Sequence, residues 1–331
     1  MTGSGVRSQP HMRGRDLDTG TQADSPTQIP VRGWREVLTR AIREAMEDNL
    51  SLLAAGVAFF TVLALFPALI ALVTLVGLVT DPTQITQQVQ SLTTGLPQAT
   101  QQLVADQLTA ITRSGDGALT LGLVVSLLAA LWSASSGTSN LMAAVNLAYE
   151  EQENRGFVRL RAIALLLTLG GIVFLVGTLA LIAVVPVVLH VMPLGPVGTV
   201  LAQVLRWTLL IALIVIRLAV LYWTAPDRNP PKFRWMTPGS VVATLLWLLG
   251  TVGFSLYVNF FGNFNKTYGA LTGVIVLMLW LYLTSYVVLL GAEINSEAEH
   301  QTECDTTVGK PRPMGQRGAV VADSLPEHRG G

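Results

Sequence analysis

The feature that most constrains this chain is a series of long apolar stretches, each about as long as a lipid bilayer is thick. A helix needs about 20 mostly apolar residues to cross a hydrocarbon layer roughly 30 Å deep. Six stretches reach this length, at about residues 51–79, 118–140, 162–188, 199–224, 238–261 and 270–291. They are apolar on all sides, and a segment in lipid must satisfy its own backbone, so helices are expected and alternating strands are not. The sequence therefore predicts an all-α, polytopic membrane bundle of about six transmembrane helices.

Charge is too sparse in this chain for an ordinary water-soluble domain. Charged residues make up 13% of the sequence, whereas soluble domains carry roughly a quarter. The formal net charge is zero, which predicts no electrostatic attraction to nucleic acid. The single cysteine, Cys304, rules out a disulfide framework or a cysteine metal cluster within one chain.

The two ends of the chain differ in composition from the middle. Residues 1–30 are polar, rich in Gly, Ser, Thr and Pro, and lack the short apolar core of a signal peptide. Residues 297–331 have the same polar character. Segments of this kind bury too little apolar surface to become ordered by themselves. Both ends are therefore predicted to be disordered tails flanking a membrane domain at 31–296.

Basic residues fall in alternate loops, which sets the expected orientation. They lie before the first apolar stretch, between the second and third, and between the fourth and fifth: Arg32, Arg35, Arg40, Arg43, Arg155, Arg159, Arg161, Arg228, Lys232 and Arg234. The other loops contain only Arg113 and Lys266. Because basic loops stay on the cytoplasmic side, both termini are predicted to be cytoplasmic.

Two segments outside the apolar stretches have the pattern of amphipathic helices. Between residues 34 and 46, apolar positions recur every three or four residues, with Arg and Glu elsewhere. Such a helix lies either in the interface of the inner leaflet or packed on the bundle, and the pattern fits both. The long outer loop at 81–117 contains two shorter patterns that predict helices capping the outer mouth.

Several motifs share their order and spacing with a known family. They are Ala54-Ala-Gly-Val-Ala-Phe-Phe-Thr-Val-Leu-Ala-Leu-Phe66-Pro67, Leu131-Trp-Ser-Ala-Ser-Ser-Gly137, Asn146-Leu-Ala-Tyr149, Trp235-Met-Thr-Pro-Gly239, Trp280-Leu-Tyr282 and Gly291-Ala-Glu-Ile-Asn295. From about Trp34 to Asn295 the chain resembles the YihY/BrkB family of membrane proteins, although Phe59-Phe60 stand where that family usually has a Tyr. The resemblance implies a six-span protein of the bacterial inner membrane. The family has carried the labels of virulence factor and ribonuclease, and the resemblance implies no settled activity.

The ribonuclease label can be compared with the residues present. A metal-dependent nuclease needs clustered His, Asp or Glu to hold ions and activate water. Three of the four histidines (His11, His300 and His328) lie in the tails, and only His190 is near the bundle. No acidic or histidine cluster has ligand spacing, and no Gly-rich phosphate loop is followed by Lys. We therefore expect no enzyme activity, no metal and no cofactor.

Two arginines lie within the fourth apolar stretch. Arg206 and Arg217 are close to three helical turns apart, so they project from one face with a separation of roughly 16 Å. No Asp or Glu in the middle of any stretch would neutralise them. Either each snorkels to its nearer interface, or the two form a ladder for an anionic group, such as a phosphate or carboxylate, that crosses the membrane.

Other candidate residues are polar or small. Ser133, Ser136 and Asn140 share one face of the second helix, where such residues mark either close packing or a hydrated pocket. Glu293 lies near the cytoplasmic end of the sixth helix, either alone at the interface or in reach of Arg217. The Gly-x-x-x-Gly motif of Gly269 and Gly273 is one that can join helices, including those of two copies of the chain.

These residues suggest two classes of function. In the first, the chain is a transporter or translocator of an anionic amphiphile or lipid, and the arginines, the serine face and Glu293 line the route. In the second, it is a non-transporting membrane scaffold or envelope-integrity factor, and the arginines only anchor lipid headgroups. Both make membrane lipids the expected partners. Whether Arg206 and Arg217 face the bundle or the lipid distinguishes the two.

Overall fold

Long helices form the body of the molecule. The computed structural model describes residues 19–79, 117–191, 195–260 and 272–326. Its long helices are α3 (Leu50–Val79), α6 (Gly117–Ala148), α7 (Phe157–Val191), α8 (Gly195–Thr224), α9 (Thr237–Phe260) and α11 (Thr272–His300). The shorter elements are α2 (Val31–Glu47), α12 (Val320–Asp323) and the 3-10 turns η1 (Pro26–Gln28) and η2 (Phe233–Trp235). The prediction of an all-α membrane bundle is confirmed.

The number of membrane-crossing helices is four or five in the described part of the chain. The segments long and apolar enough to cross are Phe157–Ile182, Val197–Thr224, Phe233–Val258 and Thr272–His300. α2 and the first half of α3 (Val31–Glu47 and Leu50–Leu65) meet at a bend of 67° and qualify together as a fifth. The count of six is thus approximate. Residues 80–116, which include the predicted outer-loop helices, lie outside the described residues.

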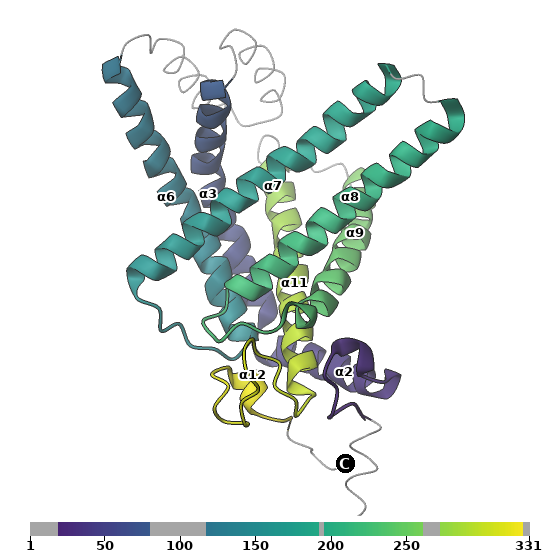
Figure 1. Ribbon diagram of the computed structural model, residues 1–331. Helices are drawn as coiled ribbons and strands as arrows, with labels where there is room; N and C mark the ends of the chain where they lie inside the picture. The colour runs from purple at the N-terminus through teal and green to yellow at the C-terminus, as the bar shows by residue number, and fades with distance from the viewer. Residues whose placement is uncertain (1–18, 80–116, 192–194, 261–271, 327–331) are drawn as a thin grey trace, which may run out of the picture.

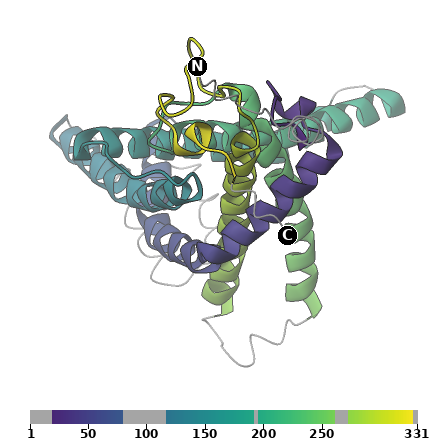
Figure 2. The same cartoon turned by 90° about the horizontal axis from the view of Figure 1, so that it is seen from below.

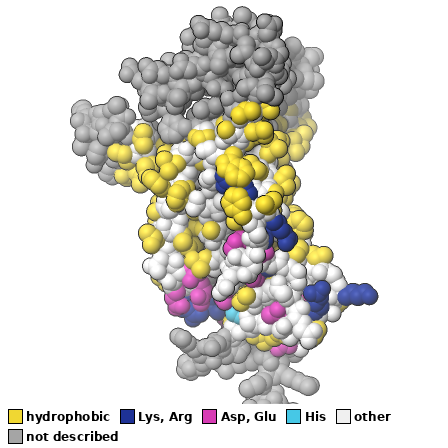
Figure 3. Space-filling model, turned by 90° about the vertical axis from the view of Figure 1, so that its left-hand side faces the viewer, with side chains coloured by type: hydrophobic (Ala, Val, Ile, Leu, Met, Phe, Trp, Pro, Cys, Tyr) yellow, Lys and Arg dark blue, Asp and Glu magenta, His cyan; other side chains and the backbone are white. Residues whose placement is uncertain are grey.

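The long helices diverge from a common base (Figure 1). α3 and α6 run side by side, α11 packs against α3 and α9, and α8 packs against α9 and α7, which in turn crosses α6. Large apolar side chains on these helices are exposed, among them Leu166, Val173, Leu201 and Leu249. In Figure 3, hydrophobic side chains are most frequent in the upper half of the coloured surface, and most of the charged side chains lie in its lower half. An apolar surface of this extent is suited to lipid.

The base collects the loops and both terminal segments (Figure 2). The backbone N–H of Asn154 donates to Asp227 at 2.8 Å, which joins the α6–α7 loop to the α8–α9 loop. The backbone N–H of Asn229 donates to the carbonyl oxygen of Gly318 at 2.9 Å, which adds the C-terminal segment. The basic loops therefore lie at one end of the molecule, as their alternation requires. That this end is cytoplasmic stays a prediction.

The C-terminal segment is folded in its described part, and the prediction of a disordered tail at 297–331 is wrong there. α11 continues to His300, and residues 301–326 fold back on the base. Arg317 is buried in this segment, where its guanidinium donates to the carbonyl oxygens of Ala322 and Glu303, each at 2.6 Å. Residues 327–331 lie outside the described residues.

The N-terminal segment from residue 19 is ordered together with the C-terminal one. The hydroxyl of Thr302 donates to the carbonyl oxygen of Ala23 at 2.7 Å, and the backbone N–H of Glu303 donates to that of Thr21 at 2.7 Å. Composition measures only what a segment can bury by itself. Here hydrogen bonds between the two polar segments stabilise both of them, and composition does not predict this stabilisation. Residues 1–18 lie outside the described residues.

The amphipathic helix α2 packs on the bundle. Val37, Ala41 and Ala45 are buried on the face that packs on α11. Of the two alternatives left by the sequence, the structure thus has the packed helix. A second apolar stripe, which includes Leu38 and Ile42, is exposed, so contact with the bilayer interface stays a prediction.

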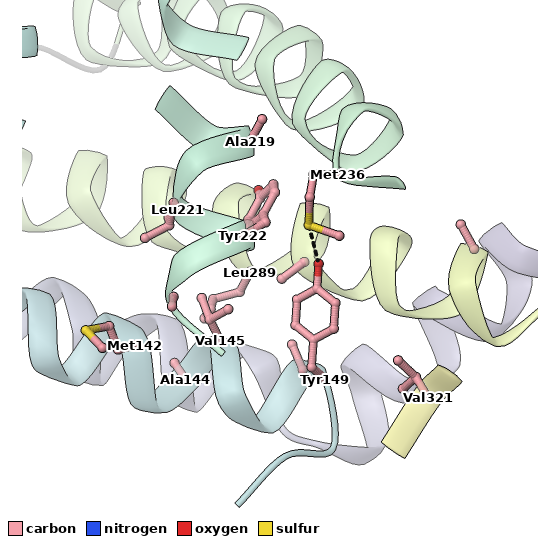
Figure 4. Close-up of a cluster of buried hydrophobic side chains, with 14 of the residues drawn as sticks. Met142, Ala144, Val145, Tyr149, Ala219, Leu221, Tyr222, Met236, Leu289 and Val321 are labelled. Carbon is pink, nitrogen blue, oxygen red and sulfur yellow. Dashed lines mark hydrogen bonds between the residues drawn. The ribbon is translucent and has the colours of Figure 1, made fainter. Parts of the chain in front are cut away.

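A cluster of large buried side chains holds the helices together at the base (Figure 4). Tyr149 follows α6, Tyr222 lies on α8, Met236 follows η2 and Leu289 lies on α11. The hydroxyl of Tyr149 points at the sulfur of Met236 at 3.5 Å. The hydroxyl of Tyr222 donates to the carbonyl oxygen of Val288 at 2.7 Å. Each aromatic side chain thus buries a large apolar area and still satisfies its polar end.

Two glycines let α9 and α11 touch. A Cβ on Gly239 would lie 2.0 Å from the carbonyl oxygen of Gly291, so no larger residue fits this crossing. Next to it, the Asn295 side chain accepts from the backbone N–H of Gly239 at 2.7 Å and donates to the carbonyl oxygen of Met236 at 3.2 Å. These contacts hold the start of α9 against the C-terminal part of α11.

Candidate functional site

Arg217 lies between α8 and α7. Its Nη2 donates to the carbonyl oxygen of Leu167 at 3.1 Å. The guanidinium lies beside Gly171, one turn along α7, where a Cβ would be 3.4 Å from Nη2, an ordinary van der Waals contact. A helix carbonyl that already accepts a backbone bond compensates little of a full positive charge. Among the described residues, Arg217 forms no ion pair.

Arg206 lies three turns away on α8. Its guanidinium is 5.3 Å from the ring centroid of Trp207. Its Nε is buried and has no hydrogen-bond partner among the described residues, and the same holds for the hydroxyl of Thr178 on α7. α7 and α8 form a hairpin in which Arg217 faces Leu167, and the same eleven-residue step along each helix leads to Arg206 and Thr178. The α7–α8 hairpin therefore carries polar groups at two levels.

The serine face of α6 is in contact with its neighbour α7. Arg161 of α7 donates to the carbonyl oxygen of Trp132 at 2.5 Å and to the hydroxyl of Ser136 at 3.2 Å. Its guanidinium also lies 4.3 Å from the Trp132 ring centroid. The Asn140 amide donates to the carbonyl oxygen of Ser136 at 2.8 Å, whereas Ser133 is exposed. The contact of Ser136 is that of a packing interface, whereas the bond of Asn140 stays within its own helix.

Glu293 lies on α11 and is only 3% exposed. Its Oε1 has no hydrogen-bond partner among the described residues. The charges that act on it come from other acids, which include Asp48 at the α2–α3 junction and Glu44 on α2. Glu293 therefore faces α2, whereas Arg217 faces α7, and the structure does not bring these two residues together.

A polar pocket opens at the base next to the end of α11. It has a volume of about 200 Å³ and is lined by Arg40, Arg43, Glu44, Glu47, Glu150, Glu297, His300 and Pro326. Burial, together with the neighbouring Glu44 and Glu47, raises the pKa of Asp48 beside this pocket. Burial also raises the pKa of Glu150, an effect that His300 opposes. The lining of the pocket thus contains more carboxyl groups than arginines.

The base contains ion pairs that sequence reasoning missed. Arg228 and Glu299 pair at 2.7 Å with side chains that are 1% and 0% exposed, and the guanidinium stacks 5.3 Å from the Tyr149 ring centroid. Arg155 pairs with Glu153 at 2.5 Å, and its hydrogen bond lowers the pKa of that carboxyl. These arginines stood out in the sequence only as signals of topology. No spacing rule links partners that lie 71 residues apart.

The predicted site residues fall in three places and not in one. Ser136 and Asn140 lie on α6, where Ser136 contacts α7, the two arginines lie on the α7–α8 hairpin, and Glu293 lies between α11 and α2. In the described ranges, no group of three or more His, Cys, Asp or Glu side chains is placed to hold a metal ion. The chemistry these groups offer is binding of anions at the arginines and exchange of protons at Glu293.

Comparison with known proteins identifies relatives of the chain. The family model described as virulence factor BrkB matches residues 41–315. The putative ribonuclease-like protein YfkH of Bacillus subtilis (strain 168) is 33% identical over 251 residues, which are 73% of this chain and 88% of that protein. A UPF0761 membrane protein of Yersinia pestis (strain Pestoides F) is 33% identical over 177 residues, which are 53% of this chain and 56% of that protein. No solved structure matches the chain.

The family match extends from α2 through every long helix and into the C-terminal segment. It therefore includes Ser136 and Asn140 on α6, the α7–α8 hairpin and Glu293, so all three candidate places lie within the matched residues. The Yersinia pestis relative carries the name membrane protein, and several described helices of this chain are long and apolar enough to cross a bilayer. The chain is a membrane protein that belongs to the virulence factor BrkB family.

Proposed function

We propose that this protein is a translocator of an anionic amphiphile, such as a lipid with a phosphate or carboxylate headgroup. The observation that carries the proposal is the α7–α8 hairpin, where Arg206 and Arg217 lie within an apolar helix and no described acid neutralises either. An unpaired arginine in a bilayer costs at least a few kcal/mol. An anionic headgroup would offset this cost by charge-assisted hydrogen bonds to the planar guanidinium.

An apolar groove on α8 supports the amphiphile over a small anion. It has a volume of about 400 Å³ and is lined by Thr199, Val200, Gln203, Val204, Trp207, Thr208 and Ile211. Trp207, which lines the groove, also lies under the Arg206 guanidinium, so a headgroup at the arginine and an acyl chain in the groove would both be accommodated. In this proposal the protein acts in the cytoplasmic membrane with its base and both termini on the cytoplasmic side. It is not an enzyme and has no nucleic acid partner.

The alternative is a non-transporting scaffold or envelope-integrity factor. Two observations favour it: Ser136 is engaged by Arg161, and Arg217 already donates to a backbone carbonyl. In such a protein the exposed helix faces would bind lipid or a second copy. Gly273 is exposed with open space beyond it, so it stays a candidate for such a contact. Its partner in the motif, Gly269, lies outside the described residues.

The test is which lipids stay bound to protein extracted gently into nanodiscs, read by native mass spectrometry. The variants are Arg206→Gln and Arg217→Gln, and the matched control is Arg159→Gln, which removes an exposed arginine from the start of α7. We expect anionic lipid to be retained by the wild type and the control and lost from the two α8 variants. A flipping assay in vesicles should then show the same loss. If both α8 variants retain anionic lipid as the wild type does, the result would favour the scaffold.

A further inference from the structure

Three glutamates are buried along the last turns of α11, and one of them differs from the others. Glu297 pairs with Arg40 at 2.5 Å, and Glu299 pairs with Arg228 at 2.7 Å. Glu293 is equally buried but has no cation beside it in the described residues, and its Oε1 has no hydrogen bond. One oxygen of Glu299 also lacks a hydrogen bond, but the charge of that carboxylate is paired.

The charged groups around Glu293 can be assigned element by element. They are Arg40, Arg43, Glu44 and Glu47 on α2, Asp48 at the α2–α3 junction, Glu150 after α6, and Glu297 and His300 on α11 itself. α3 and α9 carry no charged residue. Of the remaining neighbours of α11, α12 contributes Asp323, which binds backbone N–H groups, and η2 contributes the exposed Arg234. Arg40 and Arg43 are engaged by other acids, so the surplus around Glu293 is negative.

A buried carboxylate without a counter-charge is costly, and in a negative environment it is costlier still. The least demanding remedy is a proton, because it removes the charge without needing ligands in a fixed geometry. A metal cation would need such ligands, and the described residues contain no suitable set of three. We infer that Glu293 is a proton-binding site: a hydronium ion gives its proton to the Glu293 carboxylate, an O–H bond forms there, and a water molecule is left.

The polar pocket provides the way in. Glu297 lines the pocket and lies one helical turn from Glu293 on the same face of α11. His300, on the same stretch of helix, also lines the pocket, and its Nε2 lies 3.2 Å from the Ser324 hydroxyl. The lining of the pocket thus reaches within one turn of the buried carboxyl, at Glu297.

Proton binding at this site bears on the bend between α2 and α3. Asp48 and Asn49 form that junction, and Asn49 has a positive φ of 52°, which few non-glycine residues adopt. Loss of the proton would place a second negative charge next to Asp48 and push the junction away from α11. The site does not depend on what the protein moves, so it can be tested apart from the proposed translocation, to which it would add a proton-driven step.

The experiment is an infrared pH titration of the purified full chain in nanodiscs. Surface carboxyls are ionised at neutral pH, so a C=O stretch of a protonated carboxyl at neutral pH identifies a buried acid. We expect this band in the wild type, with a shift in heavy water, a changed frequency in Glu293→Asp and loss in Glu293→Gln. Glu303→Gln is the matched control, because it removes an exposed carboxyl that does not line the pocket, and it should leave the band unchanged.

Three results would overturn the inference. The first is the absence of the band from the wild type at neutral pH. The second is its persistence in Glu293→Gln with an unchanged thermal unfolding midpoint. The third is its removal by added sodium or potassium chloride at constant pH, which would identify a metal cation in place of the proton. If Glu293→Gln does not fold, the wild-type shift in heavy water and the Glu293→Asp frequency decide the matter in the same way.

Discussion

The base of the molecule and the α7–α8 hairpin differ in how their side chains are satisfied. At the base, every residue of α11 from Gly291 to Glu299 is buried, and Glu297 and Glu299 are paired with arginines from distant parts of the chain. On the hairpin, most large apolar side chains are exposed, and Arg206 and Arg217 have no ion-pair partner among the described residues. Apart from Glu293, the charged side chains at the end of α11 are thus paired within the chain, whereas in the proposed function the hairpin arginines are paired by lipid around them.

This difference has a consequence for substitutions. A change at the base should destabilise the protein, because it disturbs close packing or buried pairs. A change on the hairpin should leave stability nearly intact and alter what binds there. The comparison fails if the two regions respond alike.

The largest expected effect is a loss of stability on substituting a glycine at the base. A Cβ on Gly291 would lie 2.4 Å from the Tyr222 hydroxyl and 2.8 Å from the Ala243 Cβ, so Gly291→Ala forces α9 and α8 away from α11. Overpacking of this kind costs about 1–3 kcal/mol. Thermal unfolding in nanodiscs should show a clearly lower midpoint.

The matched control is the same substitution on the hairpin. Nothing lies within 4 Å of a Cβ on Gly177 in α7. Ala is favoured over Gly inside a helix by roughly 0.5–1 kcal/mol, so Gly177→Ala should raise the midpoint slightly or leave it unchanged. Equal losses from both substitutions would show that the hairpin is as closely packed in the membrane as the base is.

The next effect is local and depends on pH. The Asp323 carboxylate accepts from the backbone N–H groups of Gly315, Arg317 and Gly318 at 2.7, 2.9 and 3.0 Å. Burial acts to raise the pKa of Asp323, but these donors outweigh it and lower the pKa. The resulting stabilisation is complete above the unfolded pKa of about 3.9 and is lost as the pH falls through the lower folded value. We expect the C-terminal segment to detach from the base in acid.

Limited proteolysis within residues 301–326 measures this detachment. Asp323→Asn should release the segment already at neutral pH, with a cost of roughly 1 kcal/mol for the weakened hydrogen bonds. Glu303→Gln, in an exposed position of the same segment, is the control and should behave as the wild type. Cleavage that rises equally in both variants, or that ignores acid, would contradict the role of Asp323.

The helices could be predicted from sequence, but the base could not, for a physical reason. A run of apolar residues such as α7 signals its membrane environment locally, so its place in the chain is enough to find it. The pair of Arg228 with Glu299 and the bond from Thr302 to Ala23 join residues far apart in the sequence. Amino-acid composition carries no information about such distant partners. The polar composition of the C-terminal segment therefore predicted a disordered tail, although the segment is folded.

The candidate residues show the same limit. Arg206 and Arg217 are visible in the sequence because a charge within an apolar run is unusual wherever the helix lies. The role of Arg161 at the Ser136 face depends on α7 lying against α6. The burial of Glu293 depends on α2 covering the end of α11, and its acidic surroundings come from three separate parts of the chain.

The smallest expected effect lies where the base and the hairpin meet, at Ser136. Its hydroxyl accepts from Arg161, which also holds the carbonyl oxygen of Trp132, so Ser136→Ala leaves that guanidinium partly engaged. Hydrogen bonds between helices in membranes average about 0.6 kcal/mol, so the unfolding midpoint should fall slightly and the bound lipids should not change. Loss of lipid with an unmoved midpoint would contradict this. It would assign the serine face to the path of the amphiphile, and the lipid-completed region would then begin on α6 and not on α7.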